Sequence, residues 1–236
     1  MKRTGSILAF AAVTLLAVRA DAARRPPFSA PVPSSPGKQG PVAPGGEPPG
    51  DPVSLVVDDG GLEDCLGLTV GGQFFWLNRF TPVEYPVGLT QIQILWGTIC
   101  NIAPGATFDL FTYRDNDSDP ANGAVNTSSH VNNVVTTIGS FQTIPVVVTF
   151  LPGPGDVLIG AVNRTGMSAV GQFPAAIDQT TSQVRSWAGF GGNPPVPPPV
   201  PFGTFGTIDS FQFPGNWLIR GSGTVVPVEL QDFTIH

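Results

Sequence analysis

Thr90-Gln91-Ile92-Gln93-Ile94-Leu95-Trp96 is the stretch of sequence that decides the fold class. Its apolar residues at 92, 94 and 96 fall on one face of an extended chain, and its two glutamines fall on the other. Such a period of two is typical of a β-strand with one face on the core and the other toward solvent. We therefore expect 90–96 to be a half-buried strand.

Further short apolar segments follow the same rule, and Gly, Pro, Asn or Asp clusters separate most of them. The chain contains 29 Gly and 26 Pro, which disfavour helix interiors. We predict an all-β fold, a single antiparallel β-sandwich of jelly-roll type with about 8–11 strands. The expected strands lie at 107–113, 134–138, 145–150, 156–163, 183–190, 216–221 and 224–233.

One further strand candidate, 73–80, is apolar on both faces. Phe74, Trp76 and Phe80 share one face, and Phe75 and Leu77 share the other. Such a strand is either central and covered on both sides, or it presents an aromatic surface. We expect a covered strand, and we expect 193–201, with six prolines in nine residues, to be a rigid surface loop.

The N-terminal part of the chain predicts export. Lys2 and Arg3 precede a largely apolar run of 12 residues at 7–18, which is too short to span a bilayer, and an Ala-x-Ala site follows at 20–22. We divide the chain into a signal peptide at 1–22, a Pro- and Gly-rich disordered linker at 23–52 and a β-sandwich domain at 53–236. The expected location is secreted, cell-surface or periplasmic, with no membrane span.

The charge of the predicted domain limits its partners. From residue 53 onward 14 Asp and Glu face five Arg and no Lys. Nucleic acids and anionic membranes require clustered positive charge, so we exclude both as partners. The acidity is compatible with calcium or a neutral polymer, and also with a role in solubility alone.

Two cysteines, Cys65 and Cys100, lie in the predicted domain. In an oxidising compartment the simplest outcome is one disulfide between them, which would stabilise the fold by roughly 3–4 kcal/mol. Two buried free thiols are the alternative.

The sharpest local motif is Asp115-Asn116-Asp117-Ser118-Asp119. Carboxylates at alternating positions are suited to a hard cation, which binds six to eight oxygens. The remainder does not match an EF-hand, because Pro120 and Asn126 stand where that loop needs Gly and Glu. Calcium is therefore the candidate cofactor, with Asp115, Asp117, Asp119 and Asn122 as ligands. The alternative is a solvated hairpin loop, since these residue types favour turns.

Aromatic and arginine residues suggest a second type of site. The four tryptophans lie in strand patterns, which favours core packing. If any is exposed and stacks on a sugar, we expect Trp76 or Trp187, because Arg79 and Arg185 lie close by in sequence. The candidate ligand-binding residues are therefore Trp76, Arg79, Arg185 and Trp187. The arginines also suit structural ion pairs, with Asp109, Asp178 and Asp209 as candidate partners.

Catalytic motifs are not recognisable. His130 and His236 are the only histidines, and His130 stands in a polar Asn/Ser stretch that we interpret as a loop. Two histidines therefore give little basis for a Ser-His-Asp triad or a catalytic zinc site. We expect no enzyme, although paired carboxylates for glycoside hydrolysis converge only in the fold.

Several phrases resemble uncharacterised secreted modules of bacterial exported proteins, of jelly-roll-like β-sandwich type, and 226–233 resembles the PVEL-x-x-F phrase near the C-terminus of many such proteins. The resemblance implies a fold and no activity. Its phrases are Trp76-Leu77-Asn78-Arg79-Phe80-Thr81-Pro82, Asp119-Pro120-Ala121-Asn122-Gly123, Pro174-Ala175-Ala176-Ile177-Asp178, Arg185-Ser186-Trp187 and Gly215-Asn216-Trp217-Leu218-Ile219-Arg220.

Together these features predict a non-catalytic secreted module with an adhesive, structural or assembly role. The first alternative is a carbohydrate-binding module assisted by calcium, and the second is a glycan-active hydrolase. The expected partners are a polysaccharide, another extracellular protein, or a second copy joined through an edge strand.

Overall fold

The structure, a computed structural model, describes residues 53–69, 72–103, 105–163, 172–192, 195 and 197–225. The predicted signal peptide, the linker and the phrase at 226–233 lie outside the described residues. The strands are β1 (Val53–Leu55), β2 (Asp64–Leu66), β3 (Gln73–Phe80), β4 (Val87–Leu95), β5 (Thr107–Asp115), β6 (Val125–Val135), β7 (Phe141–Leu151), β8 (Asp156–Asn163), β9 (Ala175–Asp178), β10 (Ser186–Gly191), β11 (Thr204–Thr207), β12 (Asn216–Trp217) and β13 (Ile219–Val225).

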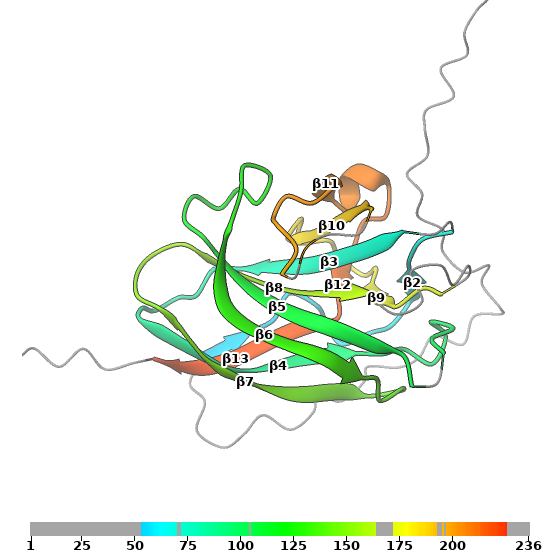
Figure 1. Ribbon diagram of the computed structural model, residues 1–236, viewed down its shortest axis with the longest axis horizontal. Coiled ribbons are helices and arrows are strands. Elements are labelled where there is room, and N and C mark those ends of the chain that lie inside the picture. The colour runs from blue at the N-terminus through cyan, green and yellow to red at the C-terminus, as the bar shows by residue number, and fades with distance from the viewer. Residues whose placement is uncertain are drawn as a thin grey trace, which may run out of the picture.

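The described part of the chain is an all-β, antiparallel sandwich of jelly-roll type, as predicted (Figure 1). One sheet has the order β1-β13-β4-β7, and a second has the order β11-β10-β3-β8-β5-β6. A third, small sheet has the order β12-β9-β2. The strands exceed the predicted number because β1, β2, β9, β11 and β12 are only two to four residues long, too short to show a period in the sequence.

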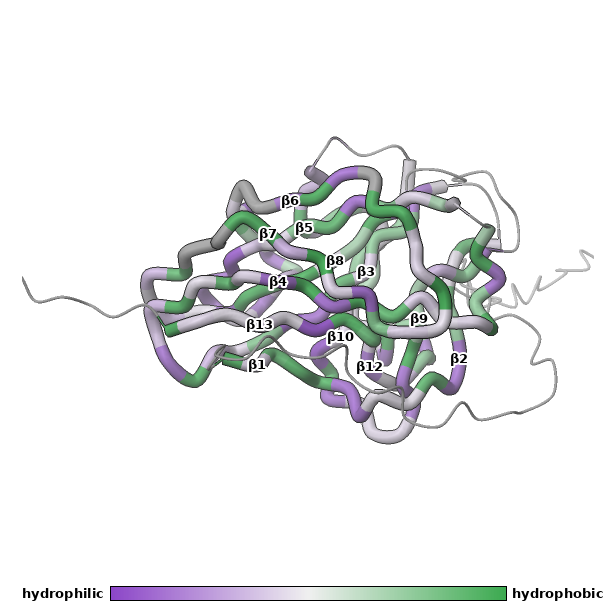
Figure 2. The backbone as a smooth tube through the Cα atoms, turned by 90° about the horizontal axis from the view of Figure 1, so that it is seen from below, coloured by the Kyte–Doolittle hydropathy of each residue, from purple (hydrophilic) through white to green (hydrophobic). Residues whose placement is uncertain are grey.

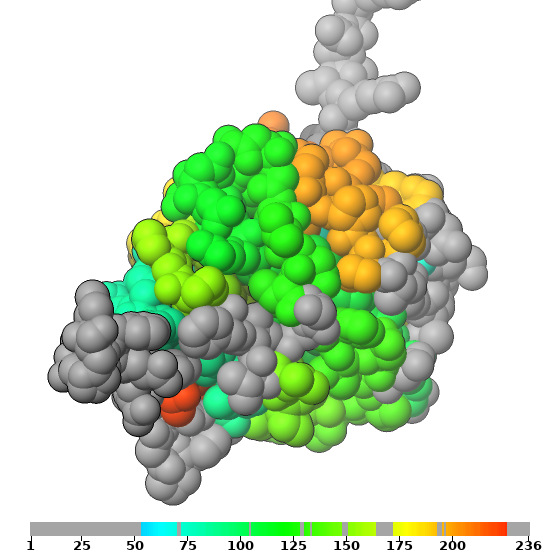
Figure 3. Space-filling model, turned by 60° about the vertical axis from the view of Figure 1, so that its left-hand side comes forward, coloured from blue at the N-terminus to red at the C-terminus, as the bar shows by residue number. Residues whose placement is uncertain are grey.

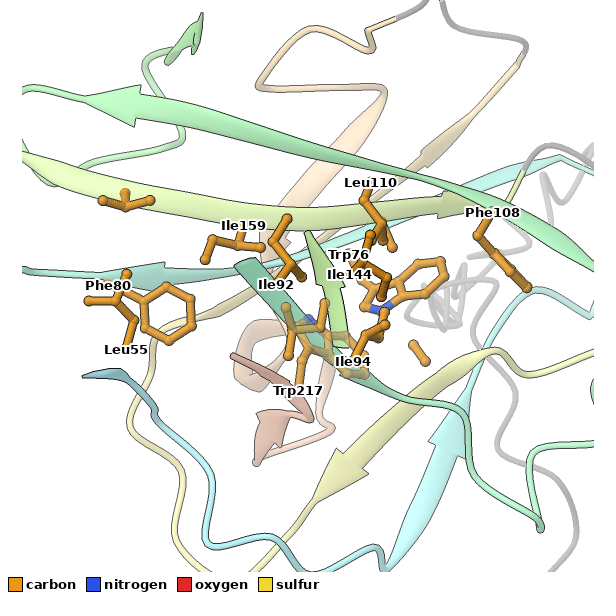
Figure 4. Packing of buried hydrophobic residues seen from close by; sticks show 14 of the residues in the cluster. Leu55, Trp76, Phe80, Ile92, Ile94, Phe108, Leu110, Ile144, Ile159 and Trp217 are labelled. Atoms are coloured by element: carbon orange, nitrogen blue, oxygen red, sulfur yellow. The ribbon is translucent and has the colours of Figure 1, made fainter. Parts of the chain in front are cut away.

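The core fills the space between the four-stranded and the six-stranded sheet (Figure 4). Ile92 and Ile94 of β4 face Trp76 of β3 across it, as their alternation predicts. Apolar and polar residues alternate visibly along β4 in Figure 2. The prediction of a half-buried strand was nevertheless wrong, because Gln91 and Gln93 are only 6% and 7% exposed.

Hydrogen bonds satisfy the buried polar face of β4. This strand lies inside its sheet, between β13 and β7, so its glutamines lie beside polar side chains of both neighbours. Gln91 donates from Nε2 to Ser222 Oγ at 2.6 Å, and Gln93 Nε2 lies 3.4 Å from Thr143 Oγ1. Buried amides with such partners are tolerated in a core.

The outer face of the six-stranded sheet is also covered. Phe75 and Leu77 of β3 are fully buried there with Tyr113 of β5, under Val200 and Phe202. The Tyr113 hydroxyl donates to the Pro198 carbonyl at 2.7 Å, which attaches the proline-rich loop to the sheet. The prediction that 73–80 is covered on both faces is therefore confirmed. Figure 3 shows the surface on this side, where segments near residues 120 and 205 lie side by side.

A disulfide joins Cys65 of β2 to Cys100 after β4, with the Cα atoms 5.2 Å apart, as predicted. Both cysteines are fully buried in a separate apolar cluster that includes Leu62, Phe141 and Phe173. The bond therefore ties the small sheet to the end of the four-stranded sheet.

Three local predictions were wrong. Of the strand expected at 134–138, only the first two residues are in a strand, because β6 ends at Val135. His130 lies in strand β6, which pairs with β5, and not in a loop. The sequence around His130 is polar and shows no strand pattern, because β6 is the last strand of its sheet and leaves residues such as His130 exposed. The expected strand at 216–221 is divided into β12 and β13, which belong to different sheets.

Candidate functional site

Four side chains from three segments form one hydrogen-bonded group, which we call the Asp156 network. Asp156, at the start of β8, is 1% exposed. Its Oδ2 accepts from Arg79 Nη1 at 2.7 Å, and its Oδ1 accepts from Thr81 Oγ1 at 2.6 Å. Arg185 Nη1 donates in turn to Thr81 Oγ1 at 2.9 Å. The network thus joins the end of β3, the start of β8 and the segment before β10.

The network borders a hollow of about 430 Å³, which we call the Arg185 hollow. Residues 54–58, Phe80, Thr81, Gln183 and Arg185 line it. Strand β1 forms one wall, and it is the last strand of its sheet among the described residues. Arg185 is half-buried, and among the described residues Thr81 is the one acceptor bonded to its guanidinium. The other N–H groups of the five on that guanidinium remain available to a ligand.

Arg79 connects this group to the loop between β5 and β6. The same Nη1 that binds Asp156 also donates to the Ser118 carbonyl at 2.8 Å. The loop is further shaped by its own carboxylates, because Asp115, Asp117 and Asp119 each accept the backbone N–H two residues ahead. These bonds are typical of Asx turns.

Burial changes the electrostatics of the loop. Asp115 is 1% exposed, and this burial raises the pKa of its carboxyl, with further contributions from the charges of Asp117 and Asp156. Asp117 is exposed, and the hydrogen bond from Asn122 Nδ2 to its Oδ2, at 2.7 Å, lowers its pKa. Asp115 and Asp117 therefore differ in environment although they stand two residues apart.

The predicted set of three carboxylate ligands is not brought together. Among the described residues no three His, Cys, Asp or Glu side chains lie close enough to hold one metal ion. Asp115 and Asp117 line a common hollow of about 390 Å³ with Asn122, and Asp119 is not part of its lining. The reason is geometric, since the turn at Asp119-Pro120 directs the third carboxylate to the N–H of Ala121.

The predicted tryptophan platform was wrong for Trp76. Its side chain is 1% exposed and packs edge-on against Trp96 and Phe108 in the core (Figure 4). Trp187 is half-buried and stacks on Phe205 with ring centroids 5.4 Å apart. Its buried Nε1 has no hydrogen-bond partner where the structure describes the chain. It lies outside the residues that line the Arg185 hollow.

Structural ion pairs were predicted correctly in kind, but the partners of Arg79 and Arg220 in the described part of the chain are not Asp109, Asp178 or Asp209. Arg79 pairs with Asp156. Arg220 pairs with the buried Asp58, donating from Nε at 3.1 Å and from Nη2 at 2.5 Å, and lies over the Phe141 ring. Asp178 and Asp209 instead accept from Thr180 and Ser182 respectively.

Sequence reasoning missed Thr81, Gln183 and residues 54–58 as lining residues, and it missed Asp156 as the centre of the network. None of them carries a motif, and they meet only because β1, β3 and β8 reach the same end of the sandwich. The side chains of the Asp156 network and of the Arg185 hollow are suited to hydrogen bonds with hydroxyl groups and anions. Where the structure describes the chain, its one histidine is His130, which is exposed and stacks on Phe111.

Within the described segments no helix has the length and apolar character that crossing a bilayer requires. No family model matches the chain, and no curated protein matches it in sequence. Solved structures do match in fold. The crystal structure of the cysteine protease and lectin-like domains of Cwp84, a surface layer associated protein of Clostridium difficile, aligns with a TM-score of 0.53 and 11% identity.

That match covers 77% of this chain and 37% of the other. A second structure, of clostridial Cwp84 after propeptide cleavage, aligns with a TM-score of 0.47 and 11% identity over 65% of this chain and 36% of that one. The present chain therefore corresponds to little more than a third of either of these longer proteins, and its likeness to the first of them concerns the fold alone.

Proposed function

We propose that this protein is a non-catalytic extracellular module that binds a saccharide in the Arg185 hollow. The observation that carries the proposal is the half-buried Arg185 guanidinium, which Thr81 holds at the edge of a hollow of about 430 Å³. Gln183 adds an amide that donates and accepts. Hydroxyl groups of a sugar match this mixture of donors and acceptors.

Recognition would rest on hydrogen bonds and charge, because Phe80, the ring in the lining, is only 3% exposed. An arginine fork binds a carboxylate in a bidentate manner. Sugars with carboxylate or sulfate groups are therefore the first ligands to examine. The disulfide and the signal-like N-terminus support the extracellular location.

The test is binding of the chain from Ala23 onward, the expected mature N-terminus, to neutral, carboxylated and sulfated polysaccharides. We expect saturable binding that Arg185→Ala reduces at least about tenfold, the effect of losing one charge-assisted hydrogen bond. Arg114→Ala removes another half-buried arginine outside the hollow, and it should bind as the parent does.

Two other outcomes would change the proposed binding site or the proposed function. If Trp187→Ala abolishes binding while Arg185→Ala does not, the saccharide lies on the Trp187–Phe205 pair. If the parent chain binds no polysaccharide, the structural or assembly role becomes the better proposal. Its size in solution, measured by light scattering, then tests self-association.

A further inference from the structure

We propose that the loop between β5 and β6 binds one calcium ion, with Asp115 and Asp117 as carboxylate ligands and Asn122 as an amide ligand. This inference goes beyond the saccharide proposal, because the Arg185 hollow has a different lining and needs no metal.

The Asp115 carboxylate has one oxygen that a cation would satisfy. Asp115 is 1% exposed, and its Oδ1 accepts the N–H of Asp117 at 3.2 Å. Its Oδ2 is buried and has no hydrogen-bond partner among the described residues. A carboxylate oxygen removed from water without a donor is costly for the fold. A bound cation satisfies that oxygen, and the nearby Asp117 carboxylate adds a second.

The charge around this loop is also negative. Across the strand pair, Asp115 lies opposite Asp156, another buried carboxylate. The carboxylates of this region outnumber its guanidinium groups by four to three, so the local charge favours a bound cation. The carboxylates are those of Asp115, Asp117, Asp119 and Asp156, and the guanidinium groups are those of Arg79, Arg114 and Arg185.

The size of the hollow and the atoms that line it also suit calcium. The hollow of about 390 Å³ that Asp115, Asp117 and Asn122 line is large enough for an ion with several of its waters. Oxygen is the donor that all three side chains offer, and calcium accepts six to eight oxygens in irregular geometry. Magnesium needs near-ideal octahedral geometry, so an irregular loop favours calcium.

The structure also explains how the loop would hold this geometry. Arg79 donates to the Ser118 carbonyl, which attaches the loop to β3. Asn122 Nδ2 donates to Asp117 Oδ2, which joins the two sides of the loop to each other. Only two carboxylates converge, and the remaining ligands would be Asn122, backbone carbonyls and water. We therefore expect a dissociation constant of about 0.1–1 mM, which is typical of extracellular calcium modules.

The test is calorimetric titration of the full chain, first stripped with chelator, with CaCl2 and in a parallel experiment with MgCl2. We expect one calcium site per chain and weaker binding of magnesium. Asp117→Asn should weaken calcium binding at least about tenfold, because one charged oxygen ligand is lost. Asp117 is exposed, so this change leaves the fold intact. Asp115→Asn should have the same effect.

The matched control is Asp59→Asn. Asp59 is also exposed and its Oδ1 also accepts the N–H two residues ahead, that of Gly61, at 2.7 Å. This variant should bind calcium as the parent does. The proposal is overturned if the parent binds no calcium up to several times the expected dissociation constant, or if both Asp115→Asn and Asp117→Asn bind as tightly as Asp59→Asn. No saccharide is present, so the result is independent of the function proposed above.

Discussion

Asp115 lies directly opposite Asp156 in the antiparallel register of β5 and β8, and each residue is 1% exposed. The two carboxylates are satisfied differently. Asp156 accepts from Arg79 and Thr81, whereas Oδ2 of Asp115 has no hydrogen-bond partner in the part of the chain that the structure describes. Of these two buried carboxylates, Asp156 therefore fixes its neighbours in place, and Asp115 has no ion-pair partner within the described segments.

The first prediction concerns Asp156→Ala. This change leaves Arg79, whose side chain is 19% exposed, without its carboxylate, and it removes the acceptor of Thr81. Breaking a buried ion pair costs about 3–5 kcal/mol, and the partial exposure of Arg79 lowers the expected loss in the free energy of unfolding to about 2–3 kcal/mol. Urea unfolding measures it. Asp209→Ala, which removes an acceptor of Ser182 outside the network, is the control and should lose clearly less.

The second prediction concerns the disulfide. Cys65 and Cys100 are 35 residues apart in sequence, and the chain-entropy relation assigns a loop of this length about 3–4 kcal/mol. The double variant Cys65→Ala, Cys100→Ala should lose that amount in urea unfolding. Treatment with a reductant should shift the parent toward the variant and leave the variant unchanged. A parent that is as stable after complete reduction as before would contradict the prediction.

The third prediction separates the two tryptophans that the sequence could not tell apart. Trp76 lies in the core between the sheets, and replacing such a residue with alanine costs about 3–5 kcal/mol. Trp187 is half-buried beside Phe205, so Trp187→Ala should cost about half as much or less. Thermal unfolding of both variants, with near-ultraviolet circular dichroism as a check on packing, gives the comparison. Equal losses of stability in the two variants would show that the residues around Trp187 are as tightly packed as those of the core.

Features that depend on residues close together in the sequence could be predicted, whereas features that depend on residues far apart in the sequence could not. Strands β3 and β8 have the bounds that were expected, because each is a long apolar run whose ends are marked by Gly, Pro or Asp. The pairing of Cys65 with Cys100 followed from there being two cysteines. Strand β6 was predicted only at its end, where a strand was expected at 134–138, because the exposed polar residues of an edge strand resemble a loop in the sequence.

The candidate site was predictable only in part, for the same reason. Arg185 was selected for its nearness to Trp187, yet the fold directs it toward Thr81, which is 104 residues away in sequence. The aspartate motif marked a turn correctly, but alternation along the chain does not determine which carboxylates are buried. Asp115 is buried because it ends a strand that is paired with β8, and Asp119 is exposed because it lies beyond that strand.

The last prediction concerns pH and Asp64 of β2. Burial raises the pKa of this carboxyl above its ordinary value of 3.8, although the N–H of Cys65 donates to its Oδ1 at 2.8 Å. Below pH 3.8 the group is protonated in the folded and the unfolded chain alike. As pH rises from 3.8 through the raised folded pKa, the unfolded chain releases its proton first, so stability is lost across that window.

At neutral pH the charged Asp64 therefore lowers the free energy of unfolding. Asp64→Asn keeps an oxygen for the Cys65 N–H and does not titrate, so the variant should be more stable than the parent at pH 7. Its advantage should shrink as the pH falls toward 4. Urea unfolding at pH 7, 5.5 and 4 measures the difference, and Asp59→Asn makes the same chemical change at an exposed site. An advantage that grows as the pH falls would mean that the charge of Asp64 stabilises the fold.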